Sequence, residues 1–240
     1  MKVSLIVPAF NEERLLAGSL DSIRAAMRAY DDAGWACELI VCDNNSTDRT
    51  AEIARAAGAS VVFEPVNQIA RARNAGAASA GGDWLVFVDA DSYPSMELFR
   101  EVSVAMQNNC LAGGATVTFE TPDRMVRLWI ALWNALSRRA RWAAGSFIFC
   151  EARAFRDVGG FSEQLYAGEE IELFRRLKRM ARRQGREIVI LHRHPLRTSD
   201  RKARLYTKRE HFAFMLKTLA LGGRNLRSRE SCYAWYDGRR

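Results

Sequence analysis

Short apolar runs and longer segments of helical apolar spacing alternate through the first half of the chain. Near-continuous apolar runs, typical of strands buried on both faces, lie at 3–7, 37–42, 60–63 and 84–88. Between them, apolar residues at helical spacing predict helices over 15–27, 46–58 and 69–80. This alternation predicts a parallel sheet with helices on both faces.

The pattern is less regular after about residue 110. It predicts a strand over 111–119 that is interrupted at Gly113-Gly114, a Trp- and Arg-rich helix over 125–144, a strand over 147–150, a helix over 171–181, a strand over 187–192 and a helix over 202–221. No repeat or linker divides the chain, so we expect one domain over 1–240. We expect the more regular half of this domain to be residues 1–110 and its basic half to be residues 111–240.

Polar clusters directly follow three of the predicted strands. They are Asn11-Glu12-Glu13, Asp43-Asn44-Asn45-Ser46 and Asp89-Ala90-Asp91. Right-handed crossovers bring the carboxyl ends of parallel strands to one edge, where ligands bind. Asp89 and Asp91 could share a hard divalent cation, because Mg²⁺ and Mn²⁺ prefer oxygen ligands. The alternative for this pair is a strand end followed by an aspartate that caps a helix.

The motifs together resemble the family 2 (GT-A fold) glycosyltransferases. Those that carry the resemblance are Val7–Glu13, Asp43–Asp48, Ala72–Gly76, Val88–Asp91, Gly159–Phe161 and Gly168–Leu173, so it covers about residues 1–200. It implies a GT-A type α/β fold, with a Rossmann-like, mostly parallel central sheet and helices on both faces. It also implies a UDP-, GDP- or dTDP-sugar donor, a divalent Mn²⁺ or Mg²⁺ and inversion at the anomeric carbon. Residues 1–110 would then be the nucleotide-sugar-binding half and residues 111–240 the acceptor-side half.

The resemblance assigns donor-binding roles to residues of the first half. These are Pro8, Ala9 and Glu12 for the nucleoside, Asp43 for the base or ribose, Asp89 and Ala90 for the donor, and Asp91 with Asp89 for the metal. Asp43 suits its role because a carboxylate accepts hydrogen bonds from ring N–H groups and ribose hydroxyls. Its alternative role is in a helix capping box. Gln68, Arg71 and Arg73 lie where the family places a base-contacting residue, and a solvated helix face is the alternative for each.

Glu170 lies where the family has its catalytic Asp. Inverting transfer needs a carboxylate that takes the proton from the acceptor hydroxyl. The sequence departs from the family here, because Glu is one methylene longer than Asp. Glu169 could take the same role. Acidic residues also favour helix starts without any catalytic function.

Two histidines follow the predicted strand 187–192. The resemblance makes His194, or His192, a candidate third metal ligand, since neutral imidazole suits Mn²⁺; an exposed position among arginines is the alternative. The basic residues of Arg197–Lys202 are candidate diphosphate contacts, because guanidinium groups bind phosphate oxygens bidentately.

Charge is divided unevenly along the chain. Residues 1–120 hold 9 Lys+Arg and 16 Asp+Glu, whereas residues 121–240 hold 27 and 12. The helix over 125–144 is amphipathic and basic, so it either packs on one side with the other solvated, or lies on an anionic bilayer. Membrane contact would use Trp129, Trp133, Arg138, Arg139 and Arg141, and the acceptor would be lipid-linked or phosphorylated.

Composition narrows the remaining classes. Apolar residues make up 48% of the chain, which excludes disorder, and no run approaches the roughly 18 to 20 residues of a membrane span. The five scattered cysteines form no CxxC pair, which favours a reduced, cytoplasmic setting, at the inner membrane face if the basic helix binds lipid. A nucleotidyltransferase is disfavoured because the loop after the first strand is acidic. A nucleic-acid-binding module would explain the basic half but not three acidic strand ends.

Overall fold

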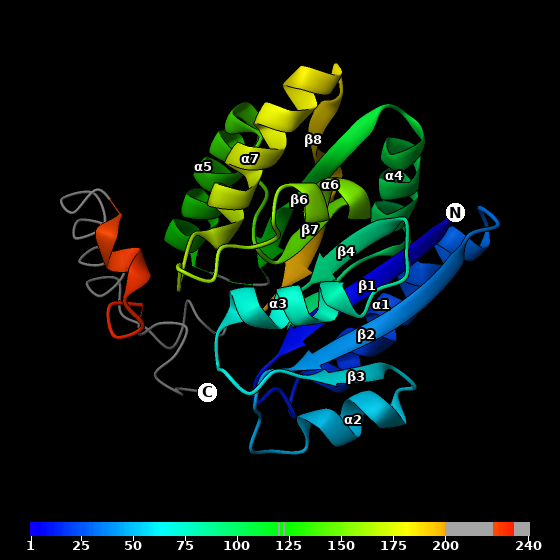
Figure 1. Cartoon of the computed structure of the whole chain (residues 1–240), viewed down its shortest axis with the longest axis vertical. Coiled ribbons are helices and arrows are strands. Elements are labelled where there is room, and N and C mark those ends of the chain that lie inside the picture. Colours follow the sequence, from blue (N-terminus) through cyan, green and yellow to red (C-terminus); the bar gives the residue numbers. More distant parts are fainter. Residues whose placement is uncertain (120, 122, 200–222, 233–240) are drawn as a thin grey trace.

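The computed structural model describes residues 1–119, 121, 123–199 and 223–232. Within these residues the strands form one eight-stranded sheet in the order β3-β2-β1-β4-β7-β6-β8-β5 (Figure 1). The expected helix over 202–221, with Arg201 and Lys202, lies outside the described residues.

The first half of the chain builds one side of the sheet. Its strands, which pair in parallel, are β1 (Lys2–Ala9), β2 (Ala36–Asp43), β3 (Ser60–Phe63) and β4 (Trp84–Val88). The helices between them are α1 (Leu16–Asp31), α2 (Thr50–Ala56) and α3 (Ile69–Ala78). The predicted alternation of strands and helices is confirmed, and the bounds of β3 and β4 agree with the apolar runs.

The second half adds strands of both directions. They are β7 (Phe147–Glu151), antiparallel to β4; β6 (Cys110–Phe119), antiparallel to β7; β8 (Glu187–Thr198), parallel to β6; and β5 (Ser92–Tyr93), antiparallel to β8. The helices are α4 (Met96–Gln107), α5 (Arg124–Ala140), α6 (Ala152–Asp157) and α7 (Glu169–Gln184), followed by a short 3₁₀ helix, Arg224–Arg227. The sheet is therefore mixed, with its parallel block at the N-terminal side.

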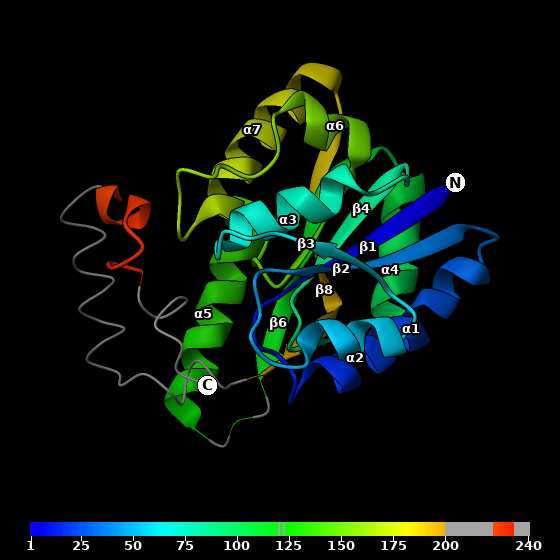
Figure 2. The ribbon, with the colours of Figure 1, turned by 60° about the horizontal axis from the view of Figure 1, so that its bottom comes forward.

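The core lies in two layers, one on each face of the sheet. Side chains alternate across β1, so Leu5 and Val7 belong to one layer and Ile6 to the other. Helices α1, α2 and α4 cover the first face, and α3, α6 and α7 cover the second (Figure 2). Helix α5 packs on the first layer through Ile130 and Trp133. Among the described residues, no helix combines the length and hydropathy that crossing a bilayer requires.

The predicted interruption of the strand at Gly113-Gly114 is wrong. Strand β6 continues through both glycines. Glycine is needed at these positions because neighbouring strands and side chains lie very close to the backbone. A Cβ on Gly113 would overlap the Phe149 ring and lie 2.6 Å from the Val189 carbonyl oxygen, and one on Gly114 would lie 2.8 Å from the Phe147 carbonyl oxygen. These glycines therefore permit close strand packing rather than a turn.

Other elements also differ from the prediction. The sequence pattern did not indicate α4, and its N-cap is Ser95, whose Oγ accepts a hydrogen bond from Leu98 N at 3.2 Å. The alternative in which Asp91 caps a helix is therefore wrong. Helix α5 ends at Ala140, because Arg141 has φ 51° in the left-handed region. Strand β8 extends six residues beyond the expected His192, to Thr198.

Candidate functional site

The carboxyl ends of β1, β2 and β4 lie at one edge of the sheet, as the positions of the polar clusters predicted. Ala9 and Asp43, the last residues of β1 and β2, are register partners. Phe87 of β4 pairs with Ile6, three residues before the end of β1. The acidic loops after these strands are therefore neighbours.

Hydrogen bonds hold the loops after β1 and β2 together. Asn11 N donates to Ser46 Oγ at 3.0 Å, and Asn11 Oδ1 accepts from Thr47 N at 2.8 Å. Glu12 N donates to Thr50 Oγ1 at 2.8 Å. The two loops thus form one unit, in which the backbone conformation of each depends on side chains of the other.

The residues predicted to hold the nucleoside lie at this unit. Pro8 and Ala9 are buried at the end of β1, and Glu12 is also buried. Asp43 is 7% exposed, and its Oδ1 accepts a hydrogen bond from Ser46 N at 3.1 Å, which closes the turn after β2. Asp43 therefore stabilises its own loop, and its position at the strand end is the one that the resemblance assigns to it.

Gln68 and Arg71 join distant loops. The buried Gln68 donates from Nε2 to the carbonyl oxygens of Glu163 and Leu165, at 2.8 and 2.9 Å. Arg71 forms ion pairs with Glu64 at 3.1 Å and Glu163 at 2.8 Å. Gln68 uses its side-chain amide to hold the loop of Glu163 and Leu165, so the interpretation of Gln68 as a base contact is wrong. Arg71, in contrast, keeps about a third of its side chain exposed.

Arg73 is the buried centre of the site. Its side chain is 1% exposed, and it donates to Glu169 Oε1 at 2.7 Å, to Asp89 Oδ1 at 2.9 Å and to the Gly145 carbonyl oxygen at 2.7 Å. Its guanidinium also lies 5.2 Å from the centre of the Phe161 ring. With these contacts Arg73 has no surface for a donor base, which corrects the sequence interpretation. It instead connects Asp89-Ala90-Asp91, the DxD segment that follows β4, with the start of α7.

Charge keeps Arg73 protonated despite its burial. Burial opposes the charged form, but the carboxylates of Asp89, Glu169 and Glu170 outweigh it and raise the pKa of Arg73. One fixed cation therefore faces three carboxylates. Such a cluster stays stable only while every member keeps its partners.

Glu169 and Glu170 are adjacent in sequence but differ in environment. Glu169 is 4% exposed and is paired with Arg73. Glu170 is half-buried, and burial, with the charge of Glu169 second, raises its pKa to about 8. The Glu170 carboxyl carbon lies 3.6 Å from the position that a Cβ on Gly145 would occupy. Glu170 therefore combines partial solvent access with a proton affinity that suits a base.

The end of β8 is attached to the DxD segment. The Asp91 carbonyl oxygen accepts from Ser199 N at 3.0 Å, and Ser92 Oγ donates to Thr198 Oγ1 at 3.0 Å. The Asp91 side chain is buried at this junction. Arg197, a predicted diphosphate contact, lies with its guanidinium 4.8 Å from the Tyr93 ring centre, two residues beyond Asp91. Sequence reasoning missed this attachment because the predicted strand stopped at His192.

His194 lies away from the acidic edge. Its Nδ1 is 2.8 Å from Oε1 of Glu101 on α4, and its side chain is 45% exposed. His192 is also exposed. Across the described part of the chain, no group of three His, Cys, Asp or Glu side chains could hold a metal ion. The structure therefore does not bring His194 to Asp89 and Asp91, which corrects its assignment as a third ligand.

The fold and site define a class of protein: a GT-A type α/β domain with an acidic edge at the carboxyl ends of its parallel strands. The sequence model of the family described as "Glycosyl transferase family 2" matches residues 4–159. The chain therefore belongs to glycosyl transferase family 2, as the motifs predicted.

Curated relatives match part of the chain. The undecaprenyl-phosphate 4-deoxy-4-formamido-L-arabinose transferase of Pseudomonas aeruginosa (strain LESB58) is 32% identical over 163 residues, which is 64% of this chain and 47% of the relative. The EpsJ glycosyltransferase of Bacillus subtilis (strain 168) is 31% identical over 114 residues, 45% of this chain and 31% of that protein. The chain thus spans about half or less of the length of these relatives.

Solved structures confirm the fold. The mannosyltransferase PcManGT from Pyrobaculum calidifontis, in complex with GDP-Man and Mn²⁺, has a TM-score of 0.64 at 20% identity, covering 94% of this chain and 62% of that one. Glucosyl-3-phosphoglycerate synthase from Mycobacterium tuberculosis, with Mn²⁺, UDP and phosphoglyceric acid, has a TM-score of 0.62 at 20% identity, covering 91% and 76%. At such identities the likeness establishes the GT-A fold alone.

Proposed function

We propose that this protein transfers a sugar from a nucleotide-diphosphate donor to an acceptor hydroxyl, with inversion at the anomeric carbon. The observation that carries the proposal is the cluster around Arg73. Through one buried guanidinium it joins Asp89, a residue of the proposed donor site, to Glu169, which precedes the proposed base. Family membership supports the same reaction class.

Glu170 is the proposed general base. In its ionised form it accepts the proton of the acceptor hydroxyl while that oxygen bonds to the anomeric carbon and the bond to the diphosphate breaks. Attack from the face opposite the leaving group inverts the configuration. Glu169 and Arg73 act as positioning residues, because their ion pair holds the start of α7 next to the DxD segment.

The donor is proposed to lie along the acidic edge. Pro8, Ala9, Glu12 and Asp43 would contact the nucleoside, and Asp89, Ala90 and Asp91 the diphosphate and sugar. Arg71 remains a candidate base contact, because its guanidinium is partly exposed.

Mn²⁺ or Mg²⁺ is proposed as the cofactor. Asp91 and the second carboxylate oxygen of Asp89 are hard oxygen donors that fit such a cation, since the first oxygen of Asp89 pairs with Arg73. A bound cation would supply charge neutralisation for the leaving diphosphate. The Mn²⁺ complexes of PcManGT and glucosyl-3-phosphoglycerate synthase support this choice.

The acceptor is proposed to be a lipid-linked phosphate, and the acceptor hydroxyl that loses its proton to Glu170 is the P–OH of its singly protonated phosphate group. The name of the P. aeruginosa relative supports this class, because it specifies undecaprenyl phosphate. The excess of basic residues over 121–240 suits a phosphorylated acceptor. The protein would then work at the inner face of a membrane.

A thermal-shift panel followed by a transfer assay tests the proposed function. UDP-, GDP-, dTDP- and CDP-sugars are screened with and without Mn²⁺, because a ligand that binds only the native state raises the melting temperature. The donor that stabilises the protein is then incubated with undecaprenyl phosphate, and release of nucleoside diphosphate is measured. Glu170→Gln is the matched control, which should bind the donor and release nucleoside diphosphate roughly 10² to 10⁴ times more slowly. No shift with any donor, with or without Mn²⁺, would contradict the proposal.

A further inference from the structure

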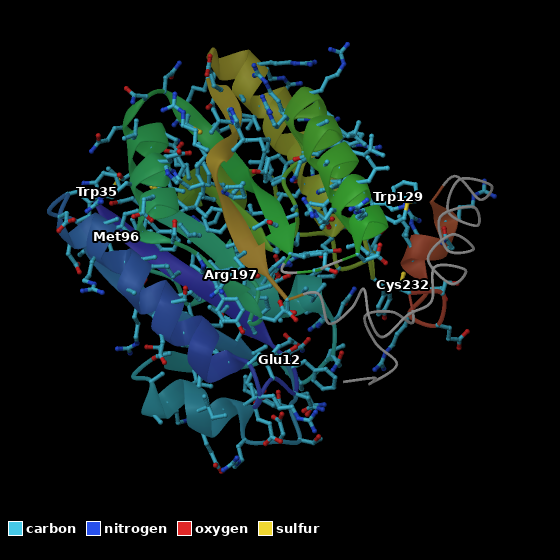
Figure 3. The ribbon with its side chains drawn as sticks, turned by 180° about the vertical axis from the view of Figure 1, so that it is seen from behind. Glu12, Trp35, Met96, Trp129, Arg197 and Cys232 are labelled. Carbon is cyan, nitrogen blue, oxygen red and sulfur yellow. The ribbon has the colours of Figure 1, made fainter. Side chains whose placement is uncertain are left out.

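The solvent-facing side of α5 carries an exposed apolar stripe. It consists of Met125, Leu128, Trp129, Leu132 and Leu136, each 49 to 58% exposed. These positions follow helical spacing, so the stripe runs along almost the whole helix. Figure 3 shows Trp129 on the side of α5 that faces away from the sheet. Exposed apolar residues in such a continuous row mark an interaction surface.

The inward side of α5 is already occupied. Ile130 and Trp133 pack against the core, and Asn134 forms hydrogen bonds with both backbone groups of Val117 on β6, at 3.1 and 2.9 Å. The helix is therefore fixed on the sheet with its second apolar face outward. Trp133 belongs to the packed side, which corrects its assignment as a membrane contact.

Positive charge surrounds the stripe. Helix α5 contains Arg124, Arg127, Arg138 and Arg139 and no acidic residue. Helix α7 meets the C-terminal end of α5, where Lys178 of α7 donates a hydrogen bond to the Ala140 carbonyl oxygen.

Arginines near the end of α5 and on α7 also act on the ammonium group of Lys178. Its pKa is lowered by burial and then by the charges of Arg182, Arg141 and Arg175. Arg141, which directly follows α5, and Arg175 and Arg182 of α7 thus add positive charge at the C-terminal end of the stripe.

We infer that this face of α5 docks the protein on an anionic lipid surface. Asp123 caps the first turn of α5, and the helix itself contains no acidic residue. An exposed apolar stripe with arginines beside it on such a helix is the pattern of a helix that lies in a membrane interface. A second copy of the chain is a poorer occupant, because it would bring the same arginines against each other. The docking itself does not depend on the proposed function.

The position of α5 connects the docking face with the proposed base. The segment Arg141–Gly145 follows the helix. It is held to the helix by Ser137, whose Oγ donates a hydrogen bond to the Trp142 carbonyl oxygen at 2.6 Å. The Gly145 carbonyl oxygen binds Arg73, and Gly145 lies next to Glu170. Docking would therefore place Glu170 near the bilayer, where a lipid-linked acceptor could reach it; this last step rests on the proposed function.

Vesicle co-sedimentation of the full chain tests the inference. Vesicles of phosphatidylglycerol and phosphatidylcholine in equal parts are compared with pure phosphatidylcholine at low and high salt. We expect binding to the anionic vesicles that weakens with salt, because exposed charges are screened. No binding to anionic vesicles at low salt would overturn the inference.

Two double variants separate the apolar and basic contributions. Leu132→Ser with Leu136→Ser should weaken binding at least tenfold, and Arg138→Gln with Arg139→Gln by roughly 30-fold, since each basic residue near an anionic surface contributes about a fivefold effect. Val104→Ser on α4, which removes an equally exposed apolar residue, is the control and should bind as the wild type does.

Further measurements keep the test independent of folding and of activity. Urea unfolding should give the same midpoint for wild type and variants, because the replaced side chains are exposed, and Trp129→Ser provides a second probe of the stripe. Sedimentation velocity without lipid should show a monomer, whereas a dimer that the leucine variant dissociates would assign the face to a second copy and overturn the inference. Vesicle binding that survives in Glu170→Gln separates docking from catalysis.

Discussion

Replacing Glu170 and Glu169 by glutamine, one at a time, is expected to change the stability of the protein in opposite directions. Both substitutions keep the shape of the side chain and remove its negative charge. The two glutamates differ in what surrounds that charge. Glu170 has no ion pair among the described contacts and a raised pKa, whereas Glu169 is buried against Arg73.

The raised pKa of Glu170 makes its ionisation costly in the folded state. The pKa of the carboxyl rises from 4.5 to about 8 on folding, so the native state binds more protons than the unfolded state between these values. Stability therefore falls as pH rises through this window. The ionisation of Glu170 lowers the free energy of unfolding by at most about 1 kcal/mol at pH 5 and about 3 kcal/mol at pH 7. Glu170→Gln cannot ionise, so its free energy of unfolding should exceed that of the wild type by an amount that grows as pH rises.

Glu169→Gln should lose stability. It removes a charged hydrogen-bond partner of the buried Arg73, which costs roughly 1.5 to 3 kcal/mol. The substitution also lowers the pKa of Glu170, because the charge of Glu169 is the second cause of its elevation. This offset is small at pH 5, so the loss is measured most cleanly there.

Urea unfolding of the wild type and both variants at pH 5 and pH 7 measures these changes. Glu52→Gln, on the exposed side of α2, is the control and should stay within about 0.5 kcal/mol of the wild type. A difference between Glu170→Gln and wild type that is equal at the two pH values would refute the raised pKa. Unchanged stability in Glu169→Gln would show that the buried ion pair contributes nothing.

The same variants test catalysis. Glu170→Gln should lower turnover by roughly 10² to 10⁴ with nucleotide affinity nearly intact, because a base acts in the chemical step. Glu169→Gln should lose less. If Glu169→Gln had no turnover and Glu170→Gln had wild-type turnover, Glu169 would be the base and Glu170 the positioning residue. Wild-type turnover in both variants would place the base elsewhere.

Further substitutions probe the metal, the buried cation and the sheet. Asp91→Ala should lower Mn²⁺-dependent nucleoside diphosphate affinity at least tenfold in isothermal titration, and chelator should do the same to the wild type; unchanged affinity in both would exclude the proposed metal site. Arg73→Met should cost about 3 to 5 kcal/mol in urea unfolding, because it leaves the buried carboxylate of Glu169 and the partly buried one of Asp89 without their cation, whereas the exposed Arg153→Met should cost little. Gly113→Ala should cost at least about 1 to 3 kcal/mol, because its Cβ overlaps the Phe149 ring, and a normal unfolding midpoint would show that the strands can separate there.

Local pattern was sufficient for the parallel half of the fold. Strands β3 and β4 are short apolar runs with clear breaks at both ends, and their bounds follow from the sequence. The pattern failed where a residue type had two structural uses. Gly113 and Gly114 suggested a break, yet they lie inside β6 because neighbouring strands and side chains leave no room for a Cβ.

For the candidate site too, the sequence predicted some features and not others. Acidic loops after β1, β2 and β4 were predictable, since parallel strands with right-handed crossovers present their carboxyl ends at one edge. The position of His194 was not, because it depends on α4, which the sequence pattern did not indicate and which supplies its partner Glu101.

Sequence by itself determined the family, the acidic edge and the pair of glutamates that begins α7. Only the tertiary structure decided which glutamate is held and which is available. Glu169 and Glu170 are identical in type and adjacent in the chain, so no local rule separates them. Their difference comes from Arg73, which lies 96 residues before Glu169 and is brought to its carboxylate by the packing of α3 against β1 and of α7 on the same face. Ionisation depends on burial and on the distance to other charges, and both are properties of the folded chain.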